Sequence, residues 1–511
     1  MSDDFDVAVV GYGPTGMTLA ALLGRLGHQV IVLERYAGLY NLPRAACFDD
    51  EIMRVFQKLG IAGDIGRGAR PQFEYDWVNA AGETLVKLEY EKTATGGWPA
   101  LFMMFQPHIE AVLDSYDKSL PTVQVWQGVT VSGVAQDAEF VTLRGADQDG
   151  RDVVVRARFA IGADGGNGFM RKEFCRHVDD YGFQENWLVC DFLLRRAVPG
   201  LPPFRQVCDP AQPTSIVTIG PDHHRFSFML DPGDSMEEVT KHENVWRRVS
   251  AFISEDDAEI IRVANYTFRS RIADKWRFDR VLLAGDAAHE MPPFLGQGMC
   301  SGIRDSHNLS WKLDLILRGL ADASLLDTYQ PEREPHVRFI TEKAIELGRV
   351  QTLRDPSKAR ERDERFLAKR RANETPEKIR FPALKGGLIG SNGEFFPQGR
   401  MRFGGRTGLF DDAIGEGWCI VALEPEAVAS LSPAQREFWQ SIGGRTVVLG
   451  QSAGQLEDID GVYAPWFTAS SCSAAVVRPD WYVYGTAQDG PELAKTLDGL
   501  ARSLEPRSAF V

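Results

Sequence analysis

Three glycines near the N-terminus, Gly11, Gly13 and Gly16, have the spacing of a turn that binds a dinucleotide. They follow an apolar run at residues 6–10, which predicts a buried strand, and they precede an apolar helical stretch at residues 17–23. We expect Gly11 to make the turn, Gly13 to let the backbone approach a phosphate, and Gly16 to let helix and strand pack closely. The helix N-terminus offers unpaired N–H groups and partial positive charge, so this turn predicts a pyrophosphate site.

A carboxylate and a second glycine block indicate that the ligand is long. Glu34 closes the next expected strand, at residues 29–33, where an acidic side chain would bind ribose hydroxyls. Gly285 and Asp286 follow another apolar run, at residues 281–284, where a second part of the same cofactor would lie. One glycine turn is compatible with any nucleotide. Two such sites in one chain favour FAD.

The composition is typical of a globular intracellular protein. The chain has 511 residues, 44% of them hydrophobic, and a formal net charge of −14 with a pI near 5.3, which disfavours a nucleic-acid partner. No apolar run approaches the ~20 residues of a membrane span, and the N-terminus lacks the features of a signal peptide. The seven cysteines are scattered without a Cys-x-x-Cys pair. We therefore expect no metal site, no disulfide framework, no membrane partner and a cytoplasmic location.

The order of the expected elements suggests a nucleotide-binding fold that is interrupted by a sheet domain. Residues 72–106 alternate apolar and polar character and predict strands, residues 298–319 predict a helix, and residues 478–485 predict a strand before a C-terminal helix at 490–503. The expected domains are an FAD-binding domain at 1–184 with inserted strands near 72–106, a substrate-binding sheet at 185–280, the completion of the FAD-binding domain with a long helix at 281–350, a charged linker at 351–399, and a C-terminal α/β domain at 400–511.

Together these motifs resemble those of the single-component FAD-dependent aromatic hydroxylases, closest to the 3-(3-hydroxyphenyl)propionate hydroxylase and phenol hydroxylase type. The resemblance rests on the glycine turn with Glu34, on residues 161–167 and on residues 280–289. It covers almost the whole chain and is weakest at residues 350–400. It implies an α/β fold: a Rossmann-like FAD-binding domain of the para-hydroxybenzoate hydroxylase type, interleaved with a β-sheet substrate domain and followed by a thioredoxin-like domain.

The resemblance implies a flavoprotein monooxygenase as well. NADH or NADPH would reduce FAD, the reduced flavin would take up dioxygen, and a C4a-hydroperoxyflavin would hydroxylate a phenolic or similar aromatic acid. The residues that the resemblance and the motifs assign to the cofactor are Gly11, Gly13, Pro14, Thr15, Gly16, Glu34, Arg35, Arg44, Gln106, Asp164, Gly285, Asp286, Pro293, Gly296, Gly298 and Met299.

The substrate is expected to lie between the flavin and the middle sheet. Phe226 and Phe228 flank Ser227, so both should point to one face of a strand, where core packing explains them as well as substrate contact does. The candidates for substrate contact are Phe192, Gln206, Cys208, Thr218, Phe226 and Phe228.

The catalytic residues are less well defined. Pro293 would border the flavin ring, whereas the base that some phenol-type relatives carry falls here on Ala46, which cannot accept a proton. Asp191 and His224 are the candidate bases that we carry forward, with His223 and Tyr266 as further options. The alternative is that the substrate enters as a phenolate or needs no base.

Other outcomes stay open on the sequence alone. The same flavin could serve epoxidation, Baeyer–Villiger insertion or the tailoring of a larger polyketide, and a non-catalytic flavin sensor is a third option. The choice between NADH and NADPH and the exact substrate are undetermined. A thioredoxin-like domain without redox cysteines would serve structure or dimer formation, which allows a homodimer.

Overall fold

The first layer of the protein is an eight-stranded sheet that contains the N-terminal strand β1. The computed structural model describes residues 4–403, 405–450 and 456–505. Strand order in this sheet is β17-β18-β11-β1-β2-β8, with β10 and then β9 attached beside β11, and the neighbours from β18 to β8 run parallel. Its strands are β1 (Phe5–Val10), β2 (Val30–Glu34), β8 (Val123–Gln127), β9 (Thr130–Gln136), β10 (Val141–Ala146), β11 (Asp152–Gly162), β17 (Arg277–Phe278) and β18 (Val281–Leu283).

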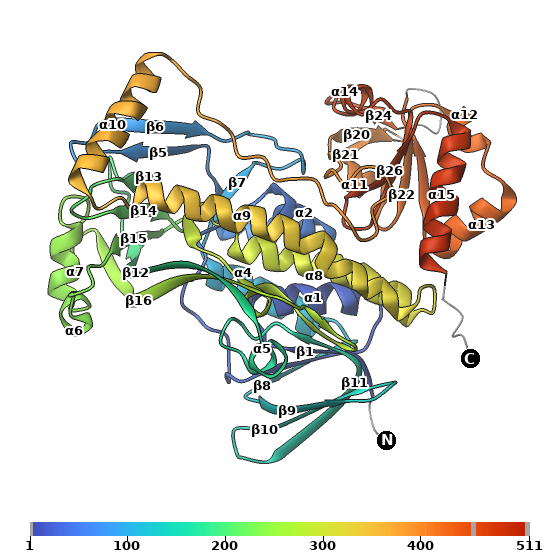
Figure 1. Cartoon of the computed structure of the whole chain (residues 1–511), viewed down its shortest axis with the longest axis horizontal. Helices are drawn as coiled ribbons and strands as arrows, with labels where there is room; N and C mark the ends of the chain where they lie inside the picture. The colour runs from blue at the N-terminus through green and yellow to red at the C-terminus, as the bar shows by residue number, and fades with distance from the viewer. Residues whose placement is uncertain (1–3, 404, 451–455, 506–511) are drawn as a thin grey trace.

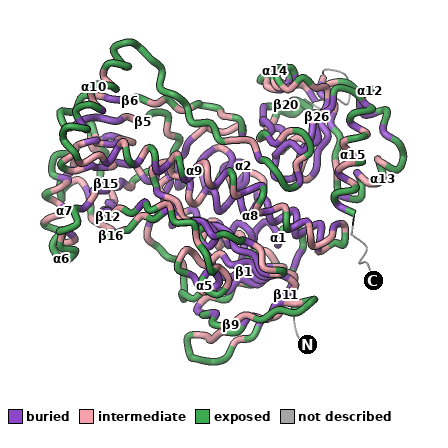
Figure 2. The backbone as a smooth tube through the Cα atoms, in the orientation of Figure 1, coloured by how far each residue is buried: buried purple, intermediate pink, exposed green. Residues whose placement is uncertain are grey.

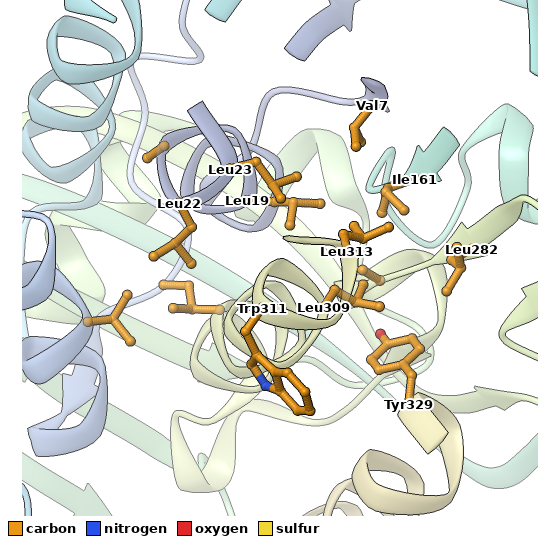
Figure 3. Close-up of a cluster of buried hydrophobic side chains, with 14 of the residues drawn as sticks. Val7, Leu19, Leu22, Leu23, Ile161, Leu282, Leu309, Trp311, Leu313 and Tyr329 are labelled. Atoms are coloured by element: carbon orange, nitrogen blue, oxygen red, sulfur yellow. The ribbon is translucent and has the colours of Figure 1, made fainter. Parts of the chain in front are cut away.

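Helices α1 (Pro14–Arg25) and α8 (Gly298–Leu317) pack together over this sheet. Both are buried over most of their length, and Figure 2 shows the buried residues gathered around α1, α8 and β1. In Figure 3, leucines of α1 and α8 lie among strand residues that include Val7, Ile161 and Leu282. Strands with helices on their faces are buried on both sides, which explains the continuous apolar runs at residues 6–10 and 281–284. The other helices of this first layer are α4 (Gln106–Ser119), α5 (Phe169–Phe174) and α9 (Tyr329–Gln351).

A second eight-stranded sheet contains most strands of the expected substrate domain, and we call it the substrate sheet. Its order is β19-β16-β12-β15-β14-β13-β5-β6, and its neighbours are antiparallel except for β13 and β5. One face packs against the short helices α6 (Met236–Val239) and α7 (His242–Val249). The strands are β5 (Glu74–Val78), β6 (Thr84–Glu89), β12 (Val178–Leu194), β13 (Phe204–Val207), β14 (Thr214–Thr218), β15 (His223–Met229), β16 (Ala258–Ala273) and β19 (His289–Glu290). Part of the 72–106 stretch therefore joins the substrate sheet.

A small sheet and two helices connect these two layers. Strands β3 (Cys47–Asp49), β7 (Leu101–Met104) and β4 (Ala69–Pro71) pair in that order. Helix α2 (Asp50–Lys58) begins directly after β3, where the Asp49 side chain accepts a hydrogen bond from the Ile52 N–H, and α3 (Ala62–Arg67) follows. An aspartate at this position caps the first helical turn.

A charged helix and an extended segment lead to the C-terminal domain. Helix α10 (Pro356–Arg371) lies beside β6, and the chain then crosses to the other side of the molecule (Figure 1). The C-terminal sheet has the order β23-β22-β25-β26, and a smaller sheet has the order β21-β20-β24. Its elements are β20 (Arg400–Phe403), β21 (Arg406–Leu409), α11 (Phe410–Ile414), β22 (Cys419–Ala422), α12 (Pro425–Ala429), α13 (Pro433–Ser441), β23 (Arg445–Val448), β24 (Glu457–Asp458), α14 (Tyr463–Ala469), β25 (Ala474–Val477), β26 (Val483–Ala487) and α15 (Gly490–Leu504).

One element of the C-terminal domain differs from the element that the sequence predicts. Residues 478–485 do not form a single strand, because residues 478–482 make the turn between β25 and β26. Trp481 has a φ of 64°, and the Arg478 N–H bonds to the Tyr482 carbonyl at 2.9 Å. The turn packs against α8, which is why a polar, irregular segment is buried there. None of the helices within the described ranges combines the length and the apolar character that a bilayer span requires.

Candidate active site

A large cavity lies where the two eight-stranded sheets and the extended segment after α10 meet. Its volume is about 2640 Å³, well above the ~300–1,000 Å³ of a site for one small ligand. Residues of the glycine turn, of β2, of the substrate sheet, of the α8 N-terminus and of residues 373–383 all line it. The cavity therefore has room for a long cofactor together with a second molecule.

The glycine turn at one end of the cavity has the shape of a phosphate cradle. Gly11 has a φ of +106°, and a Cβ built on it would lie 2.4 Å from the Ala163 carbonyl oxygen. A Cβ on Gly16 would lie 2.1 Å from the Gly11 carbonyl oxygen, so both positions require glycine. A Cβ on Gly13 would meet nothing within 4 Å, and no side chain caps α1, which begins at Pro14. The first N–H groups of α1 thus face open space in which an anion fits.

Glu34 is held beside this cradle as an acceptor for hydroxyl groups. Its two carboxylate oxygens accept the Tyr12 N–H at 2.8 Å and the Tyr36 N–H at 3.0 Å. Glu34 and Arg35 both line the cavity. A carboxylate oriented by two backbone donors retains lone pairs for sugar hydroxyls, which fits the ribose of a dinucleotide.

The middle of the cavity carries a set of polar contacts around Gln106. The Gln106 Oε1 accepts the Ala45 N–H at 2.6 Å, and its Nε2 donates to Glu110 at 2.7 Å. Arg44 forms an ion pair with the same Glu110, whose pKa is raised because the carboxyl group is buried. These contacts fix the segment around Arg44 against α4, and both Arg44 and Gln106 line the cavity.

Two aspartates, Asp164 and Asp286, line the cavity beyond the glycine turn, and their carboxyl groups have different surroundings. Asp164 accepts the Met170 N–H at 2.8 Å through one oxygen, while its buried Oδ1 has no protein partner. Burial raises the pKa of Asp164 to about 6. Asp286 lines the cavity, and desolvation by the surrounding protein raises its pKa. Both side chains can therefore accept a hydrogen bond from a ligand in the cavity.

The turn before α8 closes this end. Pro293, Gly296, Gly298 and Met299 line the cavity, and Gly296 has a φ of +65°. A Cβ on Gly296 would lie 2.3 Å from the Cys47 Sγ. The α8 N-terminus carries no side-chain cap, so its N–H groups can face a ring that gains negative charge. An anion cradle, a hydroxyl acceptor and a helix N-terminus along one cavity fit FAD.

Gly16 and Gly285 do not line the cavity but shape its walls. A Cβ on Gly285 would lie 2.6 Å from the Thr15 Oγ1, and the Gly285 N–H donates to the buried Asp305 at 3.0 Å. Gly285 thus lets η1 (Gly285–Ala287) approach α1, and Gly16 lets α1 approach β1 and the Gly11 turn. Thr15 and Pro14 do line the cavity.

The wall opposite the flavin motifs is a row of side chains that crosses the substrate sheet. Gln206, Ser215, Ser227 and Val189 are paired neighbours on β13, β14, β15 and β12, and all four line the cavity. Trp187 and Val217 lie on the same face, next to this row. The wall therefore presents hydroxyl and amide groups between apolar side chains.

Three phenylalanines chosen from the sequence face away from the cavity. Phe226 and Phe228 share one strand face as predicted, but that face packs on α7 with Phe192, in the cluster that contains Trp246. The ring centroids of Phe192 and Phe226 are 5.7 Å apart, and both side chains are fully buried. The prediction that these three side chains contact substrate is corrected, because Arg225 and Ser227 occupy the cavity face instead.

Cys208, Thr218 and His224 also lie outside the cavity lining. Cys208 is buried in the cluster of Tyr75 and Trp77, and the Thr218 hydroxyl lies 3.4 Å from the His224 Nδ1. Burial lowers the pKa of His224 to about 4, so the ring is neutral near pH 7. His224 therefore does not fit the predicted role of a base in contact with substrate. Of the substrate-contact candidates, Gln206 alone lines the cavity.

Asp191 does not line the cavity either, because arginines cover it. Its carboxylate accepts from Arg225 Nε at 2.6 Å and lies 3.8 Å from an Arg262 nitrogen. Arg225 also donates to the Pro43 carbonyl at 3.0 Å and to the Arg44 carbonyl at 2.6 Å. The pair thus fastens the segment of Arg44 to the substrate sheet. The sequence analysis missed Arg225, since no local pattern distinguishes it from other strand arginines.

A second group that the sequence analysis missed lies beside the turn before α8 and also lines the cavity. Arg304 contacts Asp49, Glu51 and Gln297, and all four are buried. The run of three acidic residues at 49–51 is the signal that could have pointed to a buried cationic partner.

Comparisons with known proteins agree with this geometry. A family model described as an FAD binding domain matches residues 4–344, and one described as the HcaD C-terminal domain matches residues 393–502. A probable NADH-specific resorcinol 4-hydroxylase of Rhodococcus jostii (strain RHA1) is 55% identical over 98% of this chain and 94% of its own length. A 3-(3-hydroxy-phenyl)propionate/3-hydroxycinnamic acid hydroxylase of Paraburkholderia xenovorans (strain LB400) is 31% identical over 94% of this chain and 88% of its own length.

Solved structures support the fold class. The flavin-dependent monooxygenase PieE, in complex with FAD and substrate, aligns with a TM-score of 0.80 at 24% identity, over 99% of this chain and 100% of its own. Aklavinone-11 hydroxylase, in a complex with FAD and aklavinone, aligns with a TM-score of 0.78 at 24% identity, over 99% of both chains. The expected fold, a flavoprotein monooxygenase fold with a further C-terminal domain, is confirmed.

Proposed function

The chain belongs to the FAD-dependent aromatic hydroxylases, which use NAD(P)H and dioxygen, and from this membership we propose that it hydroxylates a resorcinol-type phenol with NADH as reductant. A resorcinol-type phenol carries two hydroxyl groups in the meta relation. The observation that carries the proposal is the 55% identity, over almost the whole chain, to a probable NADH-specific resorcinol 4-hydroxylase. The balanced reaction consumes phenol, NADH, dioxygen and one proton, and it yields the phenol with one more hydroxyl group, NAD⁺ and water.

The central row of the cavity wall offers hydrogen-bond partners for phenolic hydroxyl groups. This row presents the Gln206 amide and the Ser215 and Ser227 hydroxyls, which can bond phenolic hydroxyl groups. Arg225 also lines the cavity, but its guanidinium is already bound to Asp191 and to two backbone carbonyls. Arg225 is therefore not a free cation for a substrate carboxylate.

The protein's part in the reaction is to bind, orient and keep water out. Bound FAD supplies the electron transfer from NADH and the activation of dioxygen. Trp187, Phe294 and Met103 line the cavity beside the turn before α8, and apolar side chains there exclude water from the reacting groups. We assign no base to Asp191 or His224. In a resorcinol, the two hydroxyl groups are ortho and para to position 4, so they make that carbon electron-rich without a protein base.

We further propose that the protein works in the cytoplasm on small molecules rather than on nucleic acid or a membrane. All seven cysteines are free in the structure, which suits a reducing compartment. The net charge of −14 does not suit a polyanionic partner.

Purified FAD-loaded protein tests the proposal. We expect resorcinol to accelerate NADH oxidation with matching dioxygen uptake, more than phenol or 3-(3-hydroxyphenyl)propionate does, and we expect NADPH to be a poorer reductant. Mass spectrometry and NMR should identify a trihydroxybenzene with an intact ring, which separates hydroxylation from epoxidation and from Baeyer–Villiger insertion. Coupled product from 3-(3-hydroxyphenyl)propionate but not from resorcinol would overturn the substrate proposal. Failure to turn over any phenol would favour a flavin sensor.

A further inference from the structure

A chain of buried polar contacts connects the C-terminal domain to the turn that lines the flavin end of the cavity. It begins at Tyr482, in the turn between β25 and β26, and ends at Gln297, directly before α8. Glu51 and Arg304 lie between them. Tyr482 and Glu51 are 431 positions apart in the sequence. The contacts therefore join two domains that each have their own sheet.

The distances define a continuous path. The Tyr482 hydroxyl lies 3.1 Å and 3.3 Å from the two Glu51 oxygens. Arg304 donates from Nε to Glu51 at 2.6 Å and from one terminal nitrogen to the Gln297 Oε1 at 2.9 Å. Its other terminal nitrogen donates to Asp49 at 2.5 Å, and the Gln297 Nε2 donates to the same Asp49 oxygen at 3.0 Å.

Gln297 occupies a special position in this path. It is the N-cap residue of α8, yet its side chain does not bond to the N–H groups of the helix. Its amide is held sideways by Asp49 and Arg304 instead. Gln297 and the neighbouring Gly296 and Gly298 line the cavity, which also borders Glu51, Arg304 and Tyr482. The position of Arg304 thus sets the position of the turn, while the first N–H groups of α8 are left free for a ligand.

The buried charges explain how the Tyr482 hydroxyl influences the contact between Glu51 and Arg304. Glu51 and Asp49 are both buried, and Arg304 is the cation that contacts both. Burial raises the pKa of Glu51, while Arg304 lowers it. A phenol that donates to Glu51 stabilises its charged form and so keeps the Glu51–Arg304 contact strong. Without this donor, the buried carboxylate has one hydrogen-bond partner fewer.

We propose that Tyr482 is a positioning residue for the flavin: through Glu51, Arg304 and Gln297 it holds the turn at residues 296–298 in place against the flavin ring. The C-terminal domain thereby becomes part of the scaffold of the active site. This inference concerns the cofactor end of the cavity and does not depend on the identity of the substrate.

The test compares Tyr482→Phe with Tyr463→Phe in the full-length, FAD-loaded protein. Tyr463 is a matched control, because it is a buried tyrosine of the same domain whose hydroxyl accepts the Gly399 N–H at 3.0 Å, away from the path. In Tyr482→Phe, we expect faster hydrogen exchange at residues 296–300, a shifted visible absorption spectrum of the flavin and FAD affinity on the order of fivefold weaker. A less well held α8 N-terminus should also make the flavin reduction potential more negative. Tyr463→Phe should leave all four readouts unchanged.

A double variant separates transmission along the path from a general loss of stability. In a Glu51→Gln background, Tyr482→Phe should add little to the flavin readouts, because the path is already interrupted at Glu51. The proposal is overturned if Tyr482→Phe leaves exchange at residues 296–300 and the flavin spectrum as in the wild type. It is equally overturned if Tyr463→Phe changes them to the same degree. Neither result depends on turnover of resorcinol, so the substrate proposal stands or falls separately.

Discussion

At the residue scale, glycines shape the cofactor end of the cavity because they have no side chain. Gly11 and Gly16 have no room for a side chain, whereas Gly13 borders free space. We expect Gly13→Ala to fold with an unchanged melting temperature, because the Gly13 φ of −89° suits alanine. The variant should bind FAD at least about tenfold more weakly, since the added methyl group enters the phosphate cradle. Fluorescence titration of FAD-free protein measures this. Gly63→Ala, in α3 and also without neighbours within 4 Å, is the control. Normal FAD binding by Gly13→Ala would show that the cradle does not hold the cofactor.

At the residue scale, Asp164 makes the stability of the folded protein depend on pH. Its pKa of about 6 in the folded protein lies above the ordinary value of 3.8, so near pH 4 to 6 the folded state binds more protons than the unfolded state. The free energy of unfolding therefore falls as the pH rises from about 4 to 6. Above pH 6 the decrease that Asp164 causes reaches its full value of about 3 kcal/mol.

The variant Asp164→Asn removes this titration. In FAD-free protein, we expect it to raise the free energy of unfolding at pH 8 relative to the wild type and to lose this advantage at pH 4. Urea unfolding at both pH values measures the difference. Asp149→Asn, whose parent side chain is 64% exposed, should have the same small effect at both. An equal effect of Asp164→Asn at pH 4 and pH 8 would contradict the assignment.

At the scale of elements, the two faces of β15 have separate tasks. Ser227 faces the cavity, and Phe226 faces α7. We expect Ser227→Val to raise the KM for the phenol several-fold at an unchanged melting temperature, because the larger side chain enters the substrate wall. Phe226→Leu should instead lower the free energy of unfolding by about 1–3 kcal/mol and leave KM unchanged. Steady-state kinetics and thermal unfolding of both variants decide. A Phe226→Leu enzyme with normal stability and a raised KM would reverse the assignment of faces.

The same strand shows how far the sequence predicts this site. The alternation around Ser227 places Phe226 and Phe228 on one face, but which face meets the cavity depends on where α7 packs. The glycine turn was predictable because its constraints are local: the Gly16 Cβ would meet the Gly11 carbonyl five residues away. Arg225, Arg304 and Tyr482 carry no such signal, since their partners lie in other elements. A strong local pattern thus located the cofactor end, whereas the substrate wall needed the fold.

At the scale of the whole molecule, a buried polar cluster joins the C-terminal domain to α8 and α9. Arg478 contacts Asp480 at 3.0 Å and Glu332 at 2.8 Å, and it donates to the Leu388 carbonyl at 3.0 Å. Lys312 of α8 binds the same Glu332 oxygen at 2.9 Å, and the Trp311 Nε1 donates to Asp480 at 3.1 Å. Charges buried in this way stabilise the fold only while each keeps its partners.

We therefore expect Arg478→Met to destabilise the protein by about 3–5 kcal/mol, because Glu332 and Asp480 would then share Lys312 as their remaining nearby cation. Arg400→Met removes an ion pair of the same domain, to Asp460, but the Arg400 side chain is 61% exposed, so stability should change little. Urea unfolding followed by tryptophan fluorescence and by far-UV circular dichroism measures both variants. The two signals should coincide in the wild type and separate in Arg478→Met, because the C-terminal domain would lose its attachment before α8 and α9 unfold. Coincident curves with an unchanged midpoint would show that the domains are held together by their apolar contacts instead.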